Sequence, residues 1–416
     1  MIKNIISTLF TKGFVAIINL AILLISSKLL GVDVRGQISL LILNLAIIQI
    51  ITEIYTGYTL VYFIPRFSLI KIYRMGVVWT IISVIVSSAL LLTLFLVFKI
   101  GENTNWIHLF ALSIIIISHS FHMVILLAKE KIKAYNFLNF YQPTVLLTAL
   151  LICIYFLGIF SVYSYIIALY VSFCSSFLLS AFQVFKLFKT APISEAEIFE
   201  PKQILKNGFL NQLANLTHML SNRYNFYLLG STILVGVYSS ATSLIESVWI
   251  ISGSVTPIIL TFIANSTDST KNSNVTFLLA KICFLLSVVC VGVLLFIPDE
   301  FFTYILGKDF SSTKNIMLHL SPGVIVISFS SIISHYFSGL GKQNYLVLAN
   351  VAGFITTILF AQTLINQYQL IGACYAACLS YFVAATILTI LFMTKNKLNF
   401  TSLFRLKKDI NHLQNI

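Results

Sequence analysis

The sequence predicts an all-α polytopic membrane protein with about 12 transmembrane helices in two six-helix bundles. Three observations lead to this fold class. Hydrophobic residues make up 58% of the 416 positions and charged residues only 9%, and the mean hydropathy is +0.96. Charged residues form about a quarter of ordinary soluble domains, so this composition indicates a chain whose surface faces lipid. Twelve apolar segments are long enough to cross a bilayer, and the second six repeat features of the first six.

The apolar segments hold about 20 residues each, which is the length that a helix needs to cross roughly 30 Å of hydrocarbon. The first segment follows a basic start that has no small-residue cleavage site, so we expect it to be retained as a span and not removed as a signal peptide. The twelve segments lie near residues 9–30, 38–63, 75–98, 106–128, 137–158, 162–185, 208–230, 234–262, 275–297, 315–338, 343–365 and 369–393.

Lysine and arginine residues are distributed unevenly between the alternate loops of this topology. With the N-terminus placed in the cytoplasm, 19 of the 26 basic residues fall on the cytoplasmic side and five on the other side. Such a bias sets the orientation of a membrane protein. The net charge of +13 is therefore interpreted as an orientation signal and not as a nucleic-acid surface. We expect a multi-pass protein of the bacterial plasma (inner) membrane with both termini cytoplasmic.

A charged segment near the middle of the chain divides the spans into six and six. The expected parts are an N-terminal six-helix bundle, a cytoplasmic linker, a C-terminal six-helix bundle and a cytoplasmic tail, at residues 1–188, 189–206, 207–394 and 395–416. A search for internal repetition finds two pairs of segments that match across the linker. These are LLGVDVRGQISLL (29–41) with LLGSTILVGVYSSA (228–241), and YNFLNFYQPTVLLT (135–148) with YLVLANVAGFITTI (345–358).

The matched segments carry glycines where helices are expected to end. In both halves Leu-Leu-Gly closes one helix, and glycine does so readily because it tolerates positive φ. Six spans restore the orientation of the chain, so we expect the two bundles to be parallel repeats related by a pseudo-two-fold axis along the membrane normal. The plan implied is two bundles that face each other across a central cleft, which is typical of transporters.

Short motifs at the span junctions resemble those of a known family. SSKLLGVDVRGQISLLI is similar to the junction between spans 1 and 2 of bacterial polysaccharide-repeat-unit (O-antigen and capsule, Wzx-type) flippases, which belong to the multidrug/oligosaccharidyl-lipid/polysaccharide exporter superfamily. LLGSTILVGVYSSATSLIES resembles their junction between spans 7 and 8, and FSGLGKQN (337–344) resembles the turn after span 10. Family members often carry an acid early in span 7, where this chain departs from the pattern. The residues on which the resemblance depends are Lys28, Leu30, Gly31, Gly36, Gly236, Tyr238 and Ser239, and the departure falls on Asn211, Gln212, Asn215 and His218.

The seventh segment is the exception to the apolar pattern. It reads NGFLNQLANLTHMLSNRYNFYLLG (207–230) and contains five Asn, one Gln, one His and one Arg. Steps of four, three, four and three residues place five polar side chains within about 80° on one helix face. An unpaired amide in hydrocarbon costs several kcal/mol, so this face is expected to line water or to contact other polar groups. The five residues are Asn211, Asn215, His218, Asn222 and Asn225.

Further polar residues are expected in the same cleft. Gln49 and Glu53 lie one turn apart in the second segment, and Glu246 lies in the eighth. Ionisable side chains within a bilayer cost about 2.5–3.5 kcal/mol on insertion scales and generally face a cavity or a partner. Glu53 or Glu246 is therefore expected to couple transport to an ion. Arg223, with Lys12, is expected to hold phosphate, because arginine can bind phosphate through two parallel hydrogen bonds. Gln49 and the amides suit sugar hydroxyls, which both donate and accept.

Each candidate has a purely structural alternative. Arg223 lies about two turns from the end of its segment, so its side chain can reach the interface. Glu53 or Glu246 can be protonated and hydrogen-bonded within a bundle, and the asparagine row can join helices through interhelical hydrogen bonds. The six cysteines lie in apolar runs without ligand-like neighbours and are expected to fill the core. The same core role is expected of single histidines, among them His119, His122, His218 and His335.

The resulting hypothesis is a flippase that moves undecaprenyl-pyrophosphate-linked oligosaccharide across the plasma membrane by alternating access, coupled to H+ or Na+. We expect contacts with the lipid bilayer and with other membrane proteins of polysaccharide assembly, but no cofactor, metal or nucleic acid. A cation-coupled multidrug or metabolite exporter of the same superfamily is the alternative, since two deep carboxylates can bind cations. A membrane glycan polymerase or ligase is less favoured, because the chain has no large external loop. It also lacks the GxxxxGK[ST] motif of ATP-binding loops, and we expect no enzyme activity.

Overall fold

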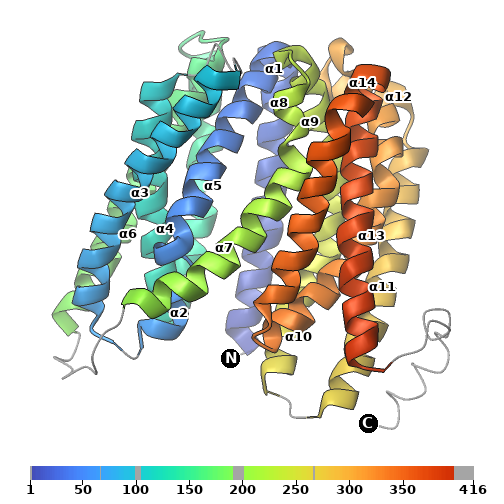
Figure 1. Ribbon diagram of the computed structural model, residues 1–416. Coiled ribbons are helices and arrows are strands. Elements are labelled where there is room, and N and C mark those ends of the chain that lie inside the picture. The colour runs from blue at the N-terminus through green and yellow to red at the C-terminus, as the bar shows by residue number, and fades with distance from the viewer. Residues whose placement is uncertain (1, 66, 99–104, 191–200, 266–267, 398–416) are drawn as a thin grey trace. The chain divides into compact units, whose positions relative to one another are not determined.

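We describe residues 2–65, 67–98, 105–190, 201–265 and 268–397 in a computed structural model of the protein (Figure 1). These residues form helices joined by short turns, and no strand occurs among them. The predicted all-α fold class is therefore confirmed. The chain divides into two compact units, Met1–Gln212 and Leu213–Ile416, which we call the first and second units.

The first unit is built from six helices and the beginning of a seventh. Its helix α1 has non-helical backbone angles at Gly31, where φ is 83°. This break separates the two spans that the sequence predicts within α1. The helices are α1 (Ile2–Thr56), α2 (Leu60–Phe63), α3 (Leu69–Phe98), α4 (Trp106–Ala128), α5 (Ile132–Tyr155), α6 (Val162–Thr190) and the first half of α7 (Pro201–Arg223).

The second unit continues from the middle of α7. Its last helix, α14, is interrupted in the same way as α1, at Gln369 with φ of 50°. The elements are α8 (Asn225–Leu228), α9 (Thr232–Glu246), the 3-10 helix η1 (Ser247–Trp249), α10 (Ile250–Asn265), α11 (Ser269–Phe296), α12 (Asp299–Leu306), the 3-10 helix η2 (Lys308–Phe310), α13 (Thr313–Gly339) and α14 (Gln343–Lys395).

All twelve predicted segments coincide with helices of the described residues. Nine stretches there are long and apolar enough to cross a membrane. Two of the nine, Phe10–Thr56 and Gln343–Lys395, hold 47 and 53 residues and contain two predicted segments each. The seventh predicted segment is the helical run of α7 and α8, which is too polar to be counted among the nine.

The turns that precede α5 and α14 have the same geometry in the two units. Glu130 and Gly341 both have positive φ, 54° and 68°. The next residue in each turn, Lys131 or Lys342, donates its backbone N–H to a carbonyl five residues earlier, at 2.9 Å in both cases. This bond closes the helix that ends there, as in a Schellman motif. The match supports an internal repeat at the place where the sequence predicts one.

Two further pairs of residues with positive φ match between the units, and the first of these pairs has the same spacing along the chain. Gly158 (φ 65°) separates α5 from α6, and Gln369 (φ 50°) divides α14 at the same offset in the chain. Gly31 (φ 83°) and Gly230 (φ 67°) end the two Leu-Leu-Gly motifs. The expectation that these glycines end helices through positive φ is confirmed at both positions.

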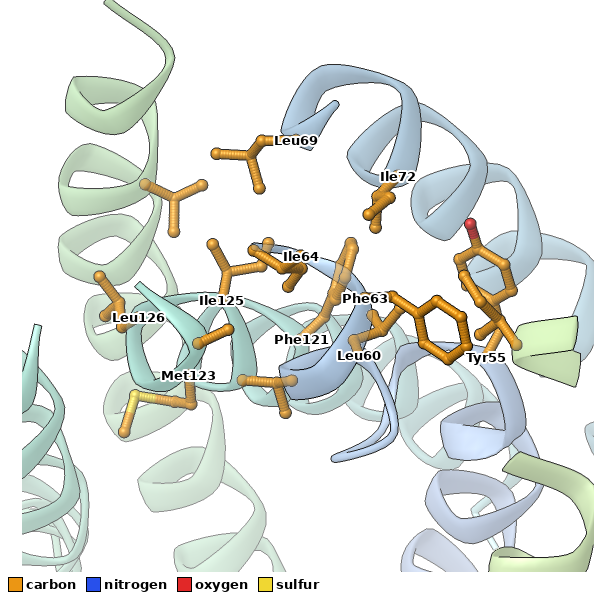
Figure 2. Packing of buried hydrophobic residues seen from close by; sticks show 14 of the residues in the cluster. Tyr55, Leu60, Phe63, Ile64, Leu69, Ile72, Phe121, Met123, Ile125 and Leu126 are labelled. Atoms are coloured by element: carbon orange, nitrogen blue, oxygen red, sulfur yellow. The ribbon is translucent and has the colours of Figure 1, made fainter. Parts of the chain in front are cut away.

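Each unit has its own apolar core. In the first unit the end of α1, the short helix α2, the start of α3 and the end of α4 pack together around Ile64 and Phe121 (Figure 2). In the second unit α10, α11, α13 and α14 contribute a cluster that includes Phe277, Ile332 and Phe392. The first core holds the ends of α1 and α4, which carry polar side chains described below.

The boundary between the units falls inside α7, between Gln212 and Leu213. α7 begins at Pro201, within the predicted linker, and α6 continues to Thr190. Proline is favoured at the first position of a helix because its missing N–H would have no partner there. The rest of the predicted linker (191–200) and most of the predicted tail (398–416) lie outside the described residues.

Candidate functional site

The predicted polar row follows α7 and passes from accessible to enclosed positions. Asn215 is exposed, Asn211 and His218 are half-buried, and Asn222 and Asn225 are buried, with 6% and 0% of their surfaces exposed. Asn211 belongs to the first unit and the other four belong to the second, and Asn225 already lies in α8. The end of the row near α8 is therefore the part that is enclosed by protein.

The first half of α7 packs closely against the end of α1. A Cβ atom at Gly208 would overlap the carbonyl oxygen of Ile54, so only glycine fits there without a shift. One turn later Gln212 Nε2 donates to the carbonyl oxygen of Glu53 at 3.5 Å. Gly57 allows this approach, because a Cβ atom there would lie 2.9 Å from Gln212 Nε2. Small residues in this way bring the backbones of two membrane helices together.

The second half of α7 and α8 bind α14 through amides. Asn350 Nδ2 of α14 donates to Ala214 O of α7 (3.0 Å), and Asn225 Nδ2 donates to Ala373 O of α14 (2.9 Å). Asn225 thus forms an interhelical bond, as the structural alternative for the row describes. Asn222 Oδ1 is buried and has no hydrogen-bond partner in the part of the chain that the structure describes. The side-chain oxygen of Asn225 is also buried and has no partner among the same residues.

Arg223 and Glu246 form an ion pair inside the second unit. Arg223 Nη1 donates to Glu246 Oε1 at 3.0 Å, and Nη2 donates to Oε2, so both oxygens are bound. The two side chains are 24% and 9% exposed, and Arg223 also lies over the ring of Phe226, 5.4 Å from its centroid. Tyr238 and Tyr381 are further electrostatic neighbours of the guanidinium. This bidentate geometry, with two parallel N–H···O bonds, is the one in which arginine binds carboxylate or phosphate most strongly.

Glu53 lies in a site of a different kind in the first unit. Its Oε1 accepts hydrogen bonds from Gln49 Nε2 (2.8 Å) and Ser120 Oγ (2.9 Å). Nearby, Trp79 Nε1 donates to the carbonyl oxygen of Thr52 (2.8 Å), which fixes α3 against α1. Among the residues described, no lysine or arginine pairs with Glu53. The carboxyl group is therefore held by neutral donors.

The structure joins some predicted site residues and leaves others apart. Gln49 meets Glu53, and Arg223 meets Glu246. Lys12 is exposed in the first half of α1, and no described contact links it to another predicted site residue. In each of these pairs, a residue that was predicted to bind substrate contacts a residue that was predicted to bind the coupling ion.

Three residues at these sites were not predicted. Ser120 is one of many serines in apolar helices, and its sequence context carries no signal that separates it from the others. Tyr238 lies in a motif on which the family resemblance rests, but nothing there connects it with Arg223. Tyr381 comes from α14, far along the chain, so only the tertiary fold places it beside the ion pair.

The buried histidines of α4 form a polar cluster of their own. His119 Nδ1 and His122 Nδ1 lie 3.3 and 3.0 Å from Ser180 Oγ of α6, and His122 Nε2 lies 3.1 Å from the hydroxyl of Tyr73. Ser180 donates its own proton to Phe177 O at 2.9 Å, so its oxygen can accept from both rings. The histidines are hydrogen-bonded core residues, as expected.

Comparison with known proteins defines the fold. No model of a known protein family matches the chain, and no curated protein matches it in sequence. Solved structures do match over nearly the whole length, and their class is that of helical membrane transporters, one of them described as a member of the MOP superfamily. At identities this low, the matches establish the fold and nothing finer.

Three of the similar structures span this class. A lipid II flippase, MurJ, in an inward closed conformation has a TM-score of 0.71 and 14% identity, covering 94% of this chain and 87% of that chain. An inward-facing multidrug resistance MATE transporter of the MOP superfamily has a TM-score of 0.68 and 16% identity, covering 92% and 98%. The Vibrio cholerae MATE transporter VcmN has a TM-score of 0.66 and 12% identity, covering 95% and 97%.

Proposed function

We propose that the chain is a flippase that moves undecaprenyl-pyrophosphate-linked oligosaccharide across the bacterial plasma membrane by alternating access. The fold supports transport, since the similar structures are named as a flippase and as MATE transporters. The observation that carries the proposal is the Arg223–Glu246 pair, which directly follows the buried Asn222 along α7. It provides a phosphate-binding cation and an open acceptor at the enclosed end of a polar helix.

In this proposal Arg223 exchanges one anion for another. Glu246 occupies the two parallel N–H donors of the guanidinium in the described state. A phosphate group has the same two-oxygen geometry and can take the place of the carboxylate. A proton that binds Glu246 removes its charge and frees Arg223 for the pyrophosphate. Loss of that proton restores the pair and releases the substrate.

The amides of α7 would contact the sugars. Asn211, Asn215 and His218 remain at least partly accessible, and each can both donate and accept hydrogen bonds. Sugar hydroxyls need this combination. Lys12, exposed on α1, is a second cation for the pyrophosphate in the proposal. Rocking of the two bundles against each other would alternate access from the two membrane faces.

A second candidate function is export of small cations coupled to H+ or Na+. The arrangement of Glu53 favours it, because this carboxyl group accepts from Gln49 and Ser120 and has no described cationic partner. Such a group can bind a proton or a cation in exchange. The two functions differ in their phenotypes. An exporter would protect cells against cationic drugs, whereas a flippase would support display of a surface glycan.

The test of the flippase proposal replaces Asn215, Asn222 or Arg223 by Leu in a strain whose surface glycan depends on this protein. We expect each variant to reduce glycan display strongly when display is compared at equal abundance of the protein in the membrane. The matched control is Asn274→Leu, which removes an exposed amide from α11. Normal display in all three variants would remove the assignment, and normal display with loss of drug resistance would favour the exporter.

A further inference from the structure

Two lysines meet where α14 begins and ends. Lys342 is the residue that precedes α14, and Lys395 is the last residue of the same helix. The break at Gln369 divides α14 into two halves, and Lys342 is an electrostatic neighbour of Lys395. Both ammonium groups lie over one group of contacting aromatic rings, so two like charges come close together at the ends of the two spans.

Three aromatic rings lie beneath the two ammonium groups. Lys342 Nζ is 5.9 Å from the ring centroid of Tyr345, and Lys395 Nζ is 5.3 Å from that of Tyr336 and 5.6 Å from that of Phe337. The rings contact one another, with Phe337 and Tyr345 centroids 4.7 Å apart. Ring faces attract cations and hold the lysine stems, but they do not neutralise charge.

No carboxylate of the described residues pairs with either lysine. Asp268, the residue that precedes α11, caps that helix, because its Oδ1 accepts from the backbone N–H of Lys271 at 3.0 Å. The beginning of α14 has no side-chain cap, in contrast to that of α11. The backbone N–H groups in its first turn carry partial positive charge and add to the two ammonium groups.

The geometry points to a binding site for a phosphate group, formed by Lys342, Lys395 and the uncapped start of α14. An anion between the two ammonium groups would turn their repulsion into attraction. Both lysines stand at the end of a membrane span, where lipid phosphates lie, so the ligand that fits is the phosphate of an anionic lipid head group. The site is separate from Arg223 and Glu246 and does not depend on the proposed transport function.

The repeat supplies a natural control. Lys131 precedes α5 in the same turn geometry as Lys342 and also lacks a side-chain cap. The position in the first unit that matches Lys395 by the same offset is Val184, which is buried and uncharged. Lys131 thus tests whether one lysine at this turn is sufficient.

The experiment measures binding of phosphatidylglycerol to the full-length protein in detergent micelles by native mass spectrometry. Diacylglycerol, which lacks the phosphate, is the comparison lipid. We expect Lys342→Gln and Lys395→Gln each to weaken phosphatidylglycerol binding about fivefold, and the double variant to weaken it further. Lys131→Gln should leave it unchanged, and Lys342→Arg with Lys395→Arg should retain it, which separates loss of charge from misfolding.

Excess inorganic phosphate distinguishes the two sources of the ligand. If inorganic phosphate competes with the lipid and its binding depends on both lysines, the site binds phosphate groups in general, and the free ion is a ligand as well. If it does not compete, the lipid head group is the ligand. Three results would overturn the site. These are an equal loss of phosphatidylglycerol binding in Lys131→Gln, wild-type binding in the double lysine variant, and diacylglycerol binding that depends on the two lysines in the same way. None of these results requires transport, so the proposed function can fail or succeed separately.

Discussion

The two units share their turns but differ in how each holds an acid within a span. In the first unit Glu53 accepts hydrogen bonds from an amide and a hydroxyl, Gln49 and Ser120. In the second unit Glu246 is bound at both oxygens by Arg223. The backbone repeat is therefore kept while the electrostatics of the two units diverge. A carboxyl group among neutral donors can change protonation with little rearrangement, whereas a paired one releases a cation when it is protonated.

The largest expected effect is loss of the ion pair. Arg223→Gln leaves the carboxylate of Glu246 uncompensated at a position only 9% exposed. We expect the free energy of unfolding to fall by about 3 kcal/mol, because removing one partner of a buried pair strands the other charge. Unfolding of the detergent-solubilised protein by sodium dodecyl sulfate measures it.

A second ion pair of the same unit serves as the control for this prediction. Lys314 Nζ lies 3.9 Å from Asp299 Oδ1, and Asp299 is 62% exposed. Exposed pairs contribute little, so Lys314→Gln should cost less than about 1 kcal/mol. An equal loss from both substitutions would contradict the special character of the Arg223–Glu246 pair.

The close approach of α1 and α7 in the first unit gives the next effect. Gly208→Ala places a Cβ atom against Ile54 O, where backbone must move, and we expect a loss of about 1–3 kcal/mol. In the second unit no described atom lies within 4 Å of the place that a Cβ atom would take at Gly253. Gly253→Ala should therefore stabilise its helix by about 0.5–1 kcal/mol. Thermal unfolding of the two variants should shift in opposite directions, and a common direction would disprove the contrast.

The helix breaks at Gly158 and Gln369 occupy matching positions in the two units. Exchanging the two residue types there should change the free energy of unfolding by a smaller amount, with opposite sign in the two units. Gln369 has φ 50° and ψ −124°, a conformation that glycine adopts more easily. Gln369→Gly should therefore raise the free energy of unfolding by about 1 kcal/mol, and Gly158→Gln should lower it by a similar amount. Denaturant titration of both variants tests the pair. A destabilising Gln369→Gly would show that the glutamine side chain has a role that outweighs its backbone strain.

The smallest expected effect is that of Glu53→Gln on stability. The amide oxygen of glutamine can still accept from Gln49 and Ser120, so the change in unfolding free energy should stay below about 1 kcal/mol. Glu246→Gln should cost clearly more, since it removes an ion pair. Equal losses of unfolding free energy from Glu53→Gln and Glu246→Gln would show that the ion pair of Glu246 stabilises the protein no more than the neutral hydrogen bonds of Glu53 do. If Glu53 binds the coupling ion, Glu53→Gln should still abolish dependence of transport on that ion.

Much of the fold follows from the sequence because membrane spans are local features. Apolar length predicts the helices of the twelve-span plan except the polar seventh segment, and Gly31 and Gly230 end helices where Leu-Leu-Gly predicts an end. The hydropathy of the sequence predicts a later start for α7 than Pro201. The first residues of this helix are charged or polar, and such a composition is also typical of a loop. Packing against α1 at Gly208 explains why this polar stretch is helical.

The site is predicted less completely than the fold. The sequence singles out both Arg223 and Glu246, but as separate phosphate and ion sites, because their distance depends on how α7 packs against α9. Helical periodicity places Asn222 and Asn225 on one face, but it does not predict which hydrogen bonds their side chains form, because these depend on tertiary contacts. Asn225 Nδ2 donates to Ala373 O, and the side-chain oxygens of both residues are buried without a hydrogen-bond partner among the described residues. Neighbours such as Ser120 cannot be recognised without the tertiary structure, since serines in membrane helices commonly bond their own backbone.

In the proposed mechanism the polar side of α7 faces water within the membrane. Asn215 and Phe209 are both exposed on this helix, on different sides of it. In a protein whose native cysteines have been replaced, Asn215→Cys should react with a charged, membrane-impermeant thiol reagent, and Phe209→Cys should not. Protection of Asn215→Cys under all transport conditions, or equal labelling of both positions, would contradict the claim.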